Sequence, residues 1–425
     1  MIKYIFIWKS IEKKSRGDMG KFDRFFQNET GPSAGSERRE PDGGGEIRGL
    51  PEGVWTSKGV YRMESAFKIG GAYGGAPLAD PERMEVMRRV GAGGPAVFLD
   101  LETTGLSGGA GTYAFLCGLG ATRGEFFTVT QYFLKSPAHE AEWLRSIDAD
   151  IPRGATLVTY NGRAFDVPML LTRHVMTRMS AHWEPSPHID LLYFSRRLYK
   201  GHLESCSLGT VERHVLGLRR GGEDVPGYLI PAMYAQYLRT RDASGLAGVF
   251  YHNRLDIASL ASLYCHVARV LGGSSGSGRE KLRAGDYWSD RGFEEEALNL
   301  WLMAGDDADA RMGSFVRRAF LAKKKQDHSS AREHFELALE EIREGRAHAA
   351  ADDLMVILEE LAKLEEHRFT SPRRALAYVR AALDALRRAR HYGGRPNPRM
   401  SQAMEHRRAR LEKKILSDGT RDNDE

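Results

Sequence analysis

The chain has 425 residues, of which 41% are hydrophobic and 28% are charged. This length predicts two or three domains, and the composition excludes a largely disordered chain. Three cysteines, far apart in sequence, are too few for a disulfide framework or a zinc ribbon, which favours a reducing compartment. No segment has the length of a signal peptide or a membrane span, so we expect a cytoplasmic protein without membrane contact.

The net charge of +5 is distributed unevenly. Residues 368–416 contain 14 Lys and Arg against 3 Asp and Glu, so the rest of the chain is acidic overall. A local basic stretch is typical of contact with a polyanion such as nucleic acid, although on helices it is more often a solvated face. Both interpretations are consistent with the sequence.

Changes in composition and periodicity divide the chain. Near the start the sequence is polar and glycine-rich, and after residue 271 a Gly/Ser segment is typical of a linker. Between them, apolar runs of strand length alternate with helical patterns, which predicts an α/β domain with a mixed central sheet flanked by helices. We expect a disordered tail at 1–50, an irregular lead-in at 51–94, the α/β domain at 95–271, a linker at 272–279, helical repeats at 280–392 and a basic helical tail at 393–425.

The elements of the α/β domain follow from the hydrophobic pattern. We expect strands at 96–101, 113–121, 126–133 and 156–160. We expect helices at 139–149, 167–179, 191–199, 207–215, 231–237 and 253–271.

A different pattern follows the linker. A small, a large and a small residue recur with the same spacing, once after 34 residues and again after a further 44. Residues so spaced share one helical face and let neighbouring helices approach closely, which resembles tetratricopeptide repeats. An irregular bundle with coincidental alanines is the alternative. The three copies are Ala297, Trp301 and Ala304; Ala331, Phe335 and Ala338; and Ala375, Val379 and Ala382.

Two acidic residues lie on the first strand of the α/β domain. Because side chains alternate across a strand, Asp100 and Glu102 point to one face, while Leu99 and Leu101 point to the core. Acids this close repel each other unless a cation lies between them, and Mg²⁺ and Mn²⁺ prefer such oxygen ligands. The pair predicts a metal site; two solvated acids at a strand end are the alternative.

Two later segments add further candidates. Asn161 and Asp166 flank a turn between a strand and a helix. His252 and Asp256 are four residues apart on a helix and therefore share one face. The sequence thus contains D-x-E, then N-x3-F-D, then a helical segment ending in Asp with a histidine nearby.

This set of motifs resembles the DEDD exonuclease superfamily of the ribonuclease H-like fold. It resembles in particular the bacterial YprB-type group, predicted exonucleases with C-terminal tetratricopeptide repeats. The resemblance covers residues 95–271 and, more weakly, 280–390. It implies that two Mg²⁺ or Mn²⁺ ions activate a water and stabilise the charge that builds on the scissile phosphate. The implied metal ligands are Asp100, Glu102, Asp166 and Asp256.

The resemblance also implies a general base in the third motif. In the usual subclasses it is a histidine five positions before the aspartate or a tyrosine four positions before it. Here Tyr251 and His252 stand at the exchanged positions relative to Asp256. We favour His252, since an imidazole titrates near neutrality, and keep Tyr251 as the alternative.

Other residues near the motifs are candidates for support and for substrate contact. We expect Asp190 to cap the helix that begins at Leu191, and Asn253 to support the site. For the remaining candidates, substrate contact is one interpretation. The alternatives are a role in a turn, packing in the core or an ordinary surface charge. These candidates are Thr103, Thr104, Asn161, Phe165, Arg196 and Arg197.

The sequence therefore predicts a Mg²⁺- or Mn²⁺-dependent nuclease. The resemblance implies a 3′→5′ exonuclease that acts on single-stranded DNA or RNA ends, with the repeats as a docking arm for a protein partner. A structure-selective endonuclease or ribonuclease with the same metal site is one alternative. A non-catalytic adaptor that binds nucleic acid is another, because one fold can serve several functions.

Overall fold

The computed structural model describes residues 47–69, 72–80, 82, 84–105, 111–221, 224–348, 351–391 and 398–421. The chain divides into two units, Met1–Ile47 and Arg48–Glu425. The tail expected at 1–50 lies outside the described residues except for its last four, so its disorder stays a prediction.

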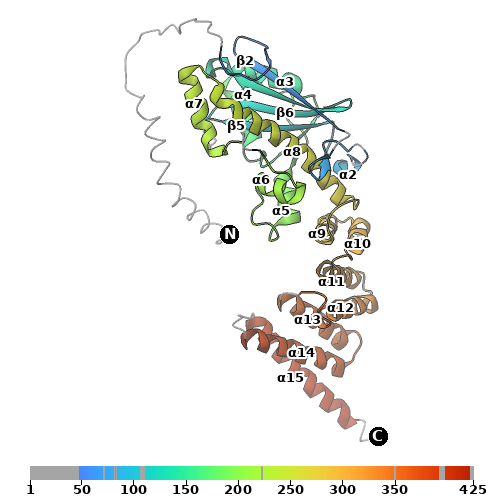
Figure 1. Cartoon of the computed structure of the whole chain (residues 1–425). Coiled ribbons are helices and arrows are strands. Elements are labelled where there is room, and N and C mark those ends of the chain that lie inside the picture. The colour runs from blue at the N-terminus through green and yellow to red at the C-terminus, as the bar shows by residue number, and fades with distance from the viewer. Residues whose placement is uncertain are drawn as a thin grey trace. The chain divides into compact units, whose positions relative to one another are not determined.

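A mixed sheet of seven strands is the centre of the α/β domain (Figure 1), in the order β1-β2-β7-β6-β5-β8-β9. Neighbouring strands from β1 to β5 in this order are antiparallel, whereas β8 lies parallel to β5 and β9 parallel to β8. This is the expected mixed sheet. The strands are β1 (Val54–Trp55), β2 (Val60–Lys68), β5 (Ala96–Thr103), β6 (Ala114–Arg123), β7 (Phe126–Leu134), β8 (Thr156–Thr159) and β9 (His188–Asp190).

The segment 51–94 is more regular than its glycine content indicates, and the expectation of an irregular lead-in was wrong. Strand β2 pairs with β7 along nine residues, from Val60 opposite Leu134 to Lys68 opposite Phe126. Its sequence mixes buried apolar with exposed charged residues, because it lies next to the sheet edge and one of its faces is partly open. The sequence of β2 therefore lacks the continuous apolar run by which a central strand is predicted.

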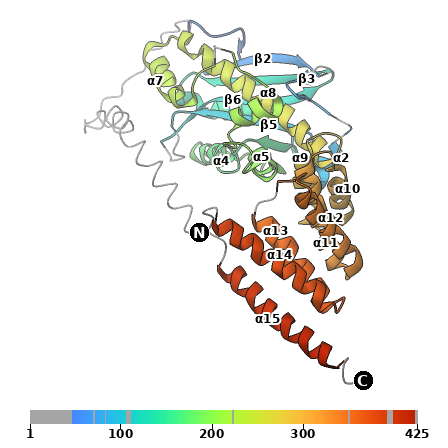
Figure 2. The same ribbon diagram turned by 60° about the horizontal axis from the view of Figure 1, so that its bottom comes forward.

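Helix α8 (Ala247–Leu271) crosses the sheet and contacts β5, β6, β7 and β8 (Figures 1 and 2). Its close approach depends on glycines of β6. A Cβ atom added to Gly118 would come within 2.5 Å of the Asn253 side chain, and one added to Gly120 within 2.5 Å of Ile257. The glycines therefore let this helix lie directly on the strand, which carries no side chains at these two positions.

Helix α3 (Glu140–Asp150) covers the opposite face. On β7, Gln131 donates a hydrogen bond to Asn253 of α8, whereas the next residue, Tyr132, donates to Asp150 of α3. Adjacent strand residues point to opposite faces, so the two helices lie on the two sides of the sheet. The other helices of the domain are α2 (Met84–Arg89), α4 (Asp166–Met176), α5 (Leu191–Tyr199), α6 (Leu208–Val211) and α7 (Ile230–Thr240).

The rest of the described chain is helical, as expected. Adjacent helices pack in the pairs α9/α10, α11/α12 and α13/α14, and α15 packs on α14. The helices are α9 (Gly278–Ser289), α10 (Glu294–Met303), α11 (Ala308–Lys324), α12 (His328–Arg343), α13 (Ala351–His367), α14 (Pro372–His391) and α15 (Pro398–Arg421).

The expected linker is shorter than predicted. Ser277 is already the N-cap of α9, and its side chain accepts a hydrogen bond from the backbone N–H of Glu280. The Glu280 carboxylate in turn accepts one from the Ser277 N–H, which completes a capping box. The Gly/Ser composition conceals this cap, because serine serves equally as a linker residue and as a helix cap.

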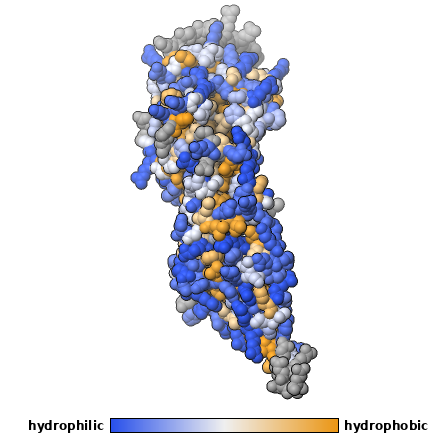
Figure 3. Space-filling model, turned by 90° about the vertical axis from the view of Figure 1, so that its right-hand side faces the viewer, coloured by the Kyte–Doolittle hydropathy of each residue, from blue (hydrophilic) through white to orange (hydrophobic). Residues whose placement is uncertain are grey.

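The repeated small-large-small residues are all buried, on or directly after helices α10, α12 and α14. They therefore face neighbouring helices, as the pattern predicts. The tetratricopeptide type of the repeats stays a prediction. Hydrophilic residues cover most of the face shown in Figure 3, with apolar residues in smaller groups. In the part of the chain that the structure describes, no helix is long and apolar enough to cross a membrane.

Candidate active site

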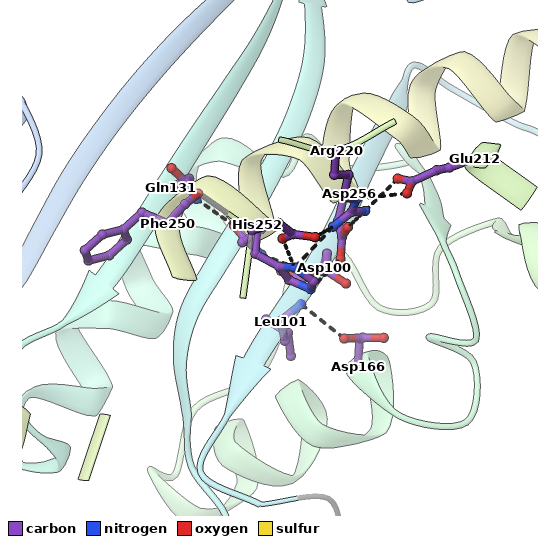
Figure 4. Close-up of polar contacts among 11 residues, drawn as sticks. Asp100, Leu101, Gln131, Asp166, Glu212, Arg220, Phe250, His252 and Asp256 are labelled. Atoms are coloured by element: carbon purple, nitrogen blue, oxygen red, sulfur yellow. Dashed lines mark hydrogen bonds and ion pairs between the residues drawn. The ribbon is translucent and has the colours of Figure 1, made fainter. Parts of the chain in front are cut away.

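The first two acids lie on β5, where α8 meets the sheet. Asp100 lies opposite Gly118 of β6, and its Oδ2 accepts a hydrogen bond from Nδ2 of Asn253 on α8, at 2.9 Å. The Oδ1 of Asn253 accepts a hydrogen bond from Gln131 Nε2, also at 2.9 Å, and the same Nε2 donates to the Phe250 carbonyl (Figure 4). These contacts fix the height of α8 above Asp100.

Asp166 comes to the same place from the start of α4. Its Oδ1 accepts a hydrogen bond from the backbone N–H of Leu101, at 3.2 Å. The preceding turn needs a left-handed residue, and Asn161 supplies it with a φ of 64°. Asp190 holds this turn, because its carboxylate accepts hydrogen bonds from the backbone N–H groups of Asn161 and Arg163, at 2.8 and 3.2 Å.

Asp190 also has the expected capping role. Its Oδ1 accepts a hydrogen bond from the backbone N–H of Leu192, at 3.1 Å, in the first turn of α5. One carboxylate therefore joins the turn before Asp166 to the next helix.

The fourth acid, Asp256 on α8, forms an ion pair with Arg220 (Figure 4). The same guanidinium forms two hydrogen bonds with Glu212, at 2.6 and 2.8 Å. Glu212 is 2% exposed, so its charge requires this partner. Arg220 thus brings a positive charge directly to the acids.

His252 lies one helical turn before Asp256, with its Nε2 at 3.4 Å from Asp256 Oδ2. Its Nδ1 lies 2.6 Å from Asp224 Oδ1 and 3.1 Å from Arg220 Nη1. We assign the Nδ1 proton to the Asp224 contact, because it is the shorter one and only the carboxylate can accept it. Tyr251, the preceding residue, has its hydroxyl near Gly221, and the guanidinium of Arg254 lies over its ring at 5.4 Å.

The four acids are close enough to repel one another. Burial raises the pKa of Asp100 well above its ordinary value, and nearby charges raise it further. Those charges belong to Asp256, Glu102 and Asp166. Burial likewise raises the pKa of Glu102, and the charges of Asp256 and Asp166 add to the shift.

The other two acids differ in their nearest partners. Burial raises the pKa of Asp166 to about 7, against the hydrogen bond from Leu101 and with help from the charge of Asp190. Burial also raises the pKa of Asp256, but Arg220 and His252 oppose this shift. Acids from β5, α4 and α8 therefore share one site, in which Asp256 is buried and the other three acids are half-buried.

A cavity of about 560 Å³ opens beside Asp256, His252, Arg220 and Asp224. Within the described ranges, no three His, Cys, Asp or Glu side chains are arranged so that they could hold a metal ion. The chemistry of the donors nevertheless fits a hard divalent cation, because all four acids offer carboxylate oxygens and their repulsion favours a positive charge.

Of the candidates for substrate contact, two threonines have a structural role and one phenylalanine is exposed. Thr103 Oγ1 donates to the Gly105 carbonyl at 2.7 Å, and Thr104 Oγ1 accepts from the Tyr113 N–H at 2.9 Å, so both shape the turn after β5. Phe165 has 53% of its surface exposed, which leaves its ring available for stacking rather than for core packing.

The two arginines of α5 differ in their surroundings. Arg196 is exposed and lines a cavity together with Asn161. Arg197 forms an ion pair with Asp290, at the end of α9. Its partner is therefore a carboxylate of the helical region, which disfavours the expected contact with substrate.

Sequence reasoning missed several residues of the site. Arg220 lies in a glycine-rich stretch without periodicity, and Asp224 and Glu212 are ordinary surface residue types until the fold places them. Gln131 left a usable signal, because it is an amide side chain in a strand that otherwise contains only apolar, aromatic and threonine residues. A buried glutamine requires partners, and these are found on α8.

Comparison with known proteins agrees with this geometry. Residues 97–268 match the family model described as the RNase_H superfamily. This segment is similar to RNase H superfamily domains. The chain is also 37% identical, over 236 residues, to "Uncharacterized protein YprB" of Bacillus subtilis (strain 168).

The match to YprB covers 55% of this chain and 54% of that protein. The chain thus spans about half the length of this homologue. The matches agree with the expected resemblance to the ribonuclease H-like fold and to YprB, and the segment that matches the RNase_H superfamily contains all four acids of the site.

Proposed function

We propose that the RNase H-like domain is a divalent-metal-dependent nuclease that hydrolyses phosphodiester bonds, with 3′→5′ action on single-stranded ends. One observation carries the proposal: β5, α4 and α8 bring four acids to one site, where Asn253 holds Asp100, the Leu101 N–H holds Asp166, and the acids raise one another's pKa. Placing like charges side by side costs stability, so such a cluster is expected where the site uses the charges. An RNase H-like superfamily fold at these residues supports a nuclease.

The proposed ligands of Mg²⁺ or Mn²⁺ are the four acids. Bound there, two ions would supply positive charge that compensates the carboxylates and stabilises the charge on a scissile phosphodiester. The ligands are Asp100, Glu102, Asp166 and Asp256. In the free protein Arg220 pairs directly with Asp256, and its positive charge also lowers the pKa of Glu102.

The protein positions its own groups around this centre. Asn253 orients the Asp100 carboxylate, and Leu101 N–H orients that of Asp166. Asp224 accepts a hydrogen bond from Nδ1 of His252, and in the neutral tautomer with its proton on Nδ1, the lone pair of Nε2 lies on the side of Asp256. His252 Nε2 can therefore take a proton from an attacking water at this side of the site, as a general base does.

Exonuclease action and its polarity follow from the resemblance to the DEDD superfamily. A structure-selective endonuclease or ribonuclease would use the same acids. A circular single-stranded substrate separates these functions, because an exonuclease leaves closed circles intact. The choice between DNA and RNA is tested with matched substrates of both kinds.

We propose tetratricopeptide-type packing for the helical region, with a protein partner docked on it. Paired helices and the buried small-large-small residues support this assignment. A non-catalytic adaptor, in which the domain only holds nucleic acid, is the competing function. Its support is the charge of residues 368–416, most of which belong to α14 and α15.

Calorimetric titration with Mn²⁺ distinguishes the enzyme from the adaptor. The enzyme predicts binding of divalent ions that disappears in Asp100→Asn and Asp256→Asn. The adaptor predicts nucleic-acid affinity without ion binding. Incubation with 5′-labelled oligonucleotides, with Mn²⁺ or with chelator, then reports hydrolysis and its direction.

A further inference from the structure

A second cavity, of about 410 Å³, lies next to the acidic site, where the RNase H-like domain meets the first helix pair. Its volume is in the range of small-ligand pockets, roughly 300–1,000 Å³. Asn161 and Asp190 line it, and both belong to the turn that precedes Asp166. The charge of Asp190 contributes to the raised pKa of Asp166, so the cavity begins beside the acids.

Three arginines line this cavity: Arg163, Arg196 and Arg291. In the described part of the chain, none of them forms an ion pair with a carboxylate, whereas the neighbouring Arg197 of α5 pairs with Asp290. The one acid of the lining, Asp190, accepts three backbone N–H hydrogen bonds and is thereby compensated. The cavity therefore has an excess of positive charge.

Two tyrosines complete the lining. The guanidinium of Arg291 stacks on the ring of Tyr287 at 3.7 Å and donates a hydrogen bond to the Tyr193 hydroxyl at 3.2 Å. Tyr287 is buried, whereas Tyr193 has 47% of its surface exposed. An exposed aromatic ring beside these guanidinium groups is a surface on which a nucleobase can stack while its phosphates are neutralised.

We propose that this cavity is a binding subsite for single-stranded nucleic acid, in which Tyr193 stacks on a base and the three arginines contact phosphates. The inference rests on the proposed nuclease function and adds that Arg291, just after helix α9, takes part in substrate binding. A strand that passes from the acids along the turn at Asn161 then reaches the first helix pair. A nucleic acid is the favoured occupant, because three charged residues of the lining are arginines and its one acid, Asp190, is compensated by backbone hydrogen bonds.

Binding measured without metal tests the subsite separately from hydrolysis. The probes are 5′-fluorescein-labelled 12-residue oligo(dT) and oligo(U), titrated with the full chain in chelator and followed by anisotropy. Tyr193→Ala and Arg291→Glu are expected to weaken binding of at least one probe about tenfold. In Arg291→Glu, the slope of log Kd against log salt is expected to decrease by roughly 0.7 for each phosphate that the protein no longer neutralises.

Further variants distinguish an effect of the cavity on binding from an effect of net charge or of misfolding. Arg283→Glu makes the same change of charge at an exposed residue of α9, outside the cavity, and should bind the probes as the unmodified chain does. Tyr193→Leu keeps an apolar side chain of similar reach and should weaken binding because it removes stacking, whereas Arg196→Glu repeats the test on α5. Unchanged affinity and salt slope in the cavity variants would overturn the subsite, as would an equal decrease of affinity in Arg283→Glu.

The nuclease proposal and the subsite proposal can be refuted independently of each other. Asp100→Asn is expected to abolish hydrolysis without weakening metal-free oligonucleotide binding, because it removes a negative charge that repels phosphates. Loss of hydrolysis in Asp100→Asn together with unchanged affinity in the cavity variants would retain the nuclease and overturn the subsite. Reduced affinity in the cavity variants, combined with normal hydrolysis by Asp100→Asn, would retain the subsite and overturn the assignment of the four acids to the nuclease centre.

Discussion

Nδ2 of Asn253 lies 2.9 Å from Oδ2 of Asp100 and joins helix α8 to strand β5 at the centre of the candidate site. Asn253 is completely buried. Since Asp256 lies three residues further along the helix, this hydrogen bond also sets the height and rotation at which Asp256 meets the other acids. The site therefore depends on how closely α8 lies on the sheet.

Gly118 should be intolerant of a side chain. The methyl group of Gly118→Ala would lie 2.5 Å from Asn253 Oδ1 and 2.8 Å from Ile257, so α8 must shift. Overpacking of this kind costs about 1–3 kcal/mol of unfolding free energy. We expect a lower midpoint of denaturant unfolding and loss of hydrolysis.

Gly245→Ala is the matched control, because its added Cβ has no neighbour within 4 Å. It should unfold and hydrolyse substrate as the unmodified chain does. A Gly118→Ala protein with normal stability and normal activity would show that α8 does not need its close position on β6.

Stability without metal should depend on pH through Asp166. Its pKa in the folded protein is about 7, above the ordinary value of 3.8. A carboxyl group with a raised pKa favours the folded state when it is protonated, so its contribution is complete below pH 3.8 and is lost as the pH rises toward 7.

In chelator, the melting temperature of the unmodified chain should therefore fall between about pH 5 and pH 8 more than that of Asp166→Asn. Mn²⁺ should raise the melting temperature of the unmodified chain at about pH 8, since an ion that binds only the folded state stabilises it. Equal pH dependence of the two proteins would contradict the burial of an uncompensated Asp166.

His252 and Tyr251 should differ in their effect on hydrolysis. His252→Ala removes the imidazole that contacts Asp224 and Asp256, and we expect the rate to decrease about 10²- to 10⁴-fold, the usual contribution of a general base. Tyr251→Phe keeps the ring that Arg254 covers and should retain nearly full activity. The reverse result would assign the base to Tyr251.

A buried ion pair should contribute strongly to the stability of the domain. Arg173 of α4 donates two hydrogen bonds to Glu140, at 2.5 and 2.6 Å, and the two side chains are 3% and 6% exposed. Arg173→Ala would leave Glu140 as a buried charge, which costs about 3–5 kcal/mol. Chemical denaturation measures this decrease in stability.

Arg88→Ala is its control, because the pair of Arg88 with Glu85 is largely exposed and should contribute little. Comparable decreases in the unfolding free energy of the two variants would show that the buried Arg173–Glu140 pair contributes no more to stability than an exposed pair.

The sequence was sufficient for the parts of the fold that repeat a simple pattern. The apolar run at β5 and the alternation of Asp100 and Glu102 with leucines are local features, and a strand of period two converts them directly into a shared face. The buried alanines of the helical region are equally local, because a single helix face determines them.

Long-range contacts account for what the sequence could not reveal. Strand β2 needs the partner β7 to become regular, and its charged residues resemble those of a loop until the pair forms. Arg220 becomes part of the site only because a loop turns it toward Asp256 and Glu212, which are far from one another in sequence. A contact of this kind leaves no periodic pattern of apolar residues in the sequence.

The most direct test of the central claim is hydrolysis of a 5′-labelled single-stranded oligonucleotide by the unmodified chain and by Asp100→Asn, with Mn²⁺ or with chelator. We expect a ladder of products shortened from the 3′ end only with the unmodified chain and Mn²⁺. A folded Asp100→Asn protein that degrades the oligonucleotide at the unmodified rate would contradict the assignment of these acids to a nuclease centre.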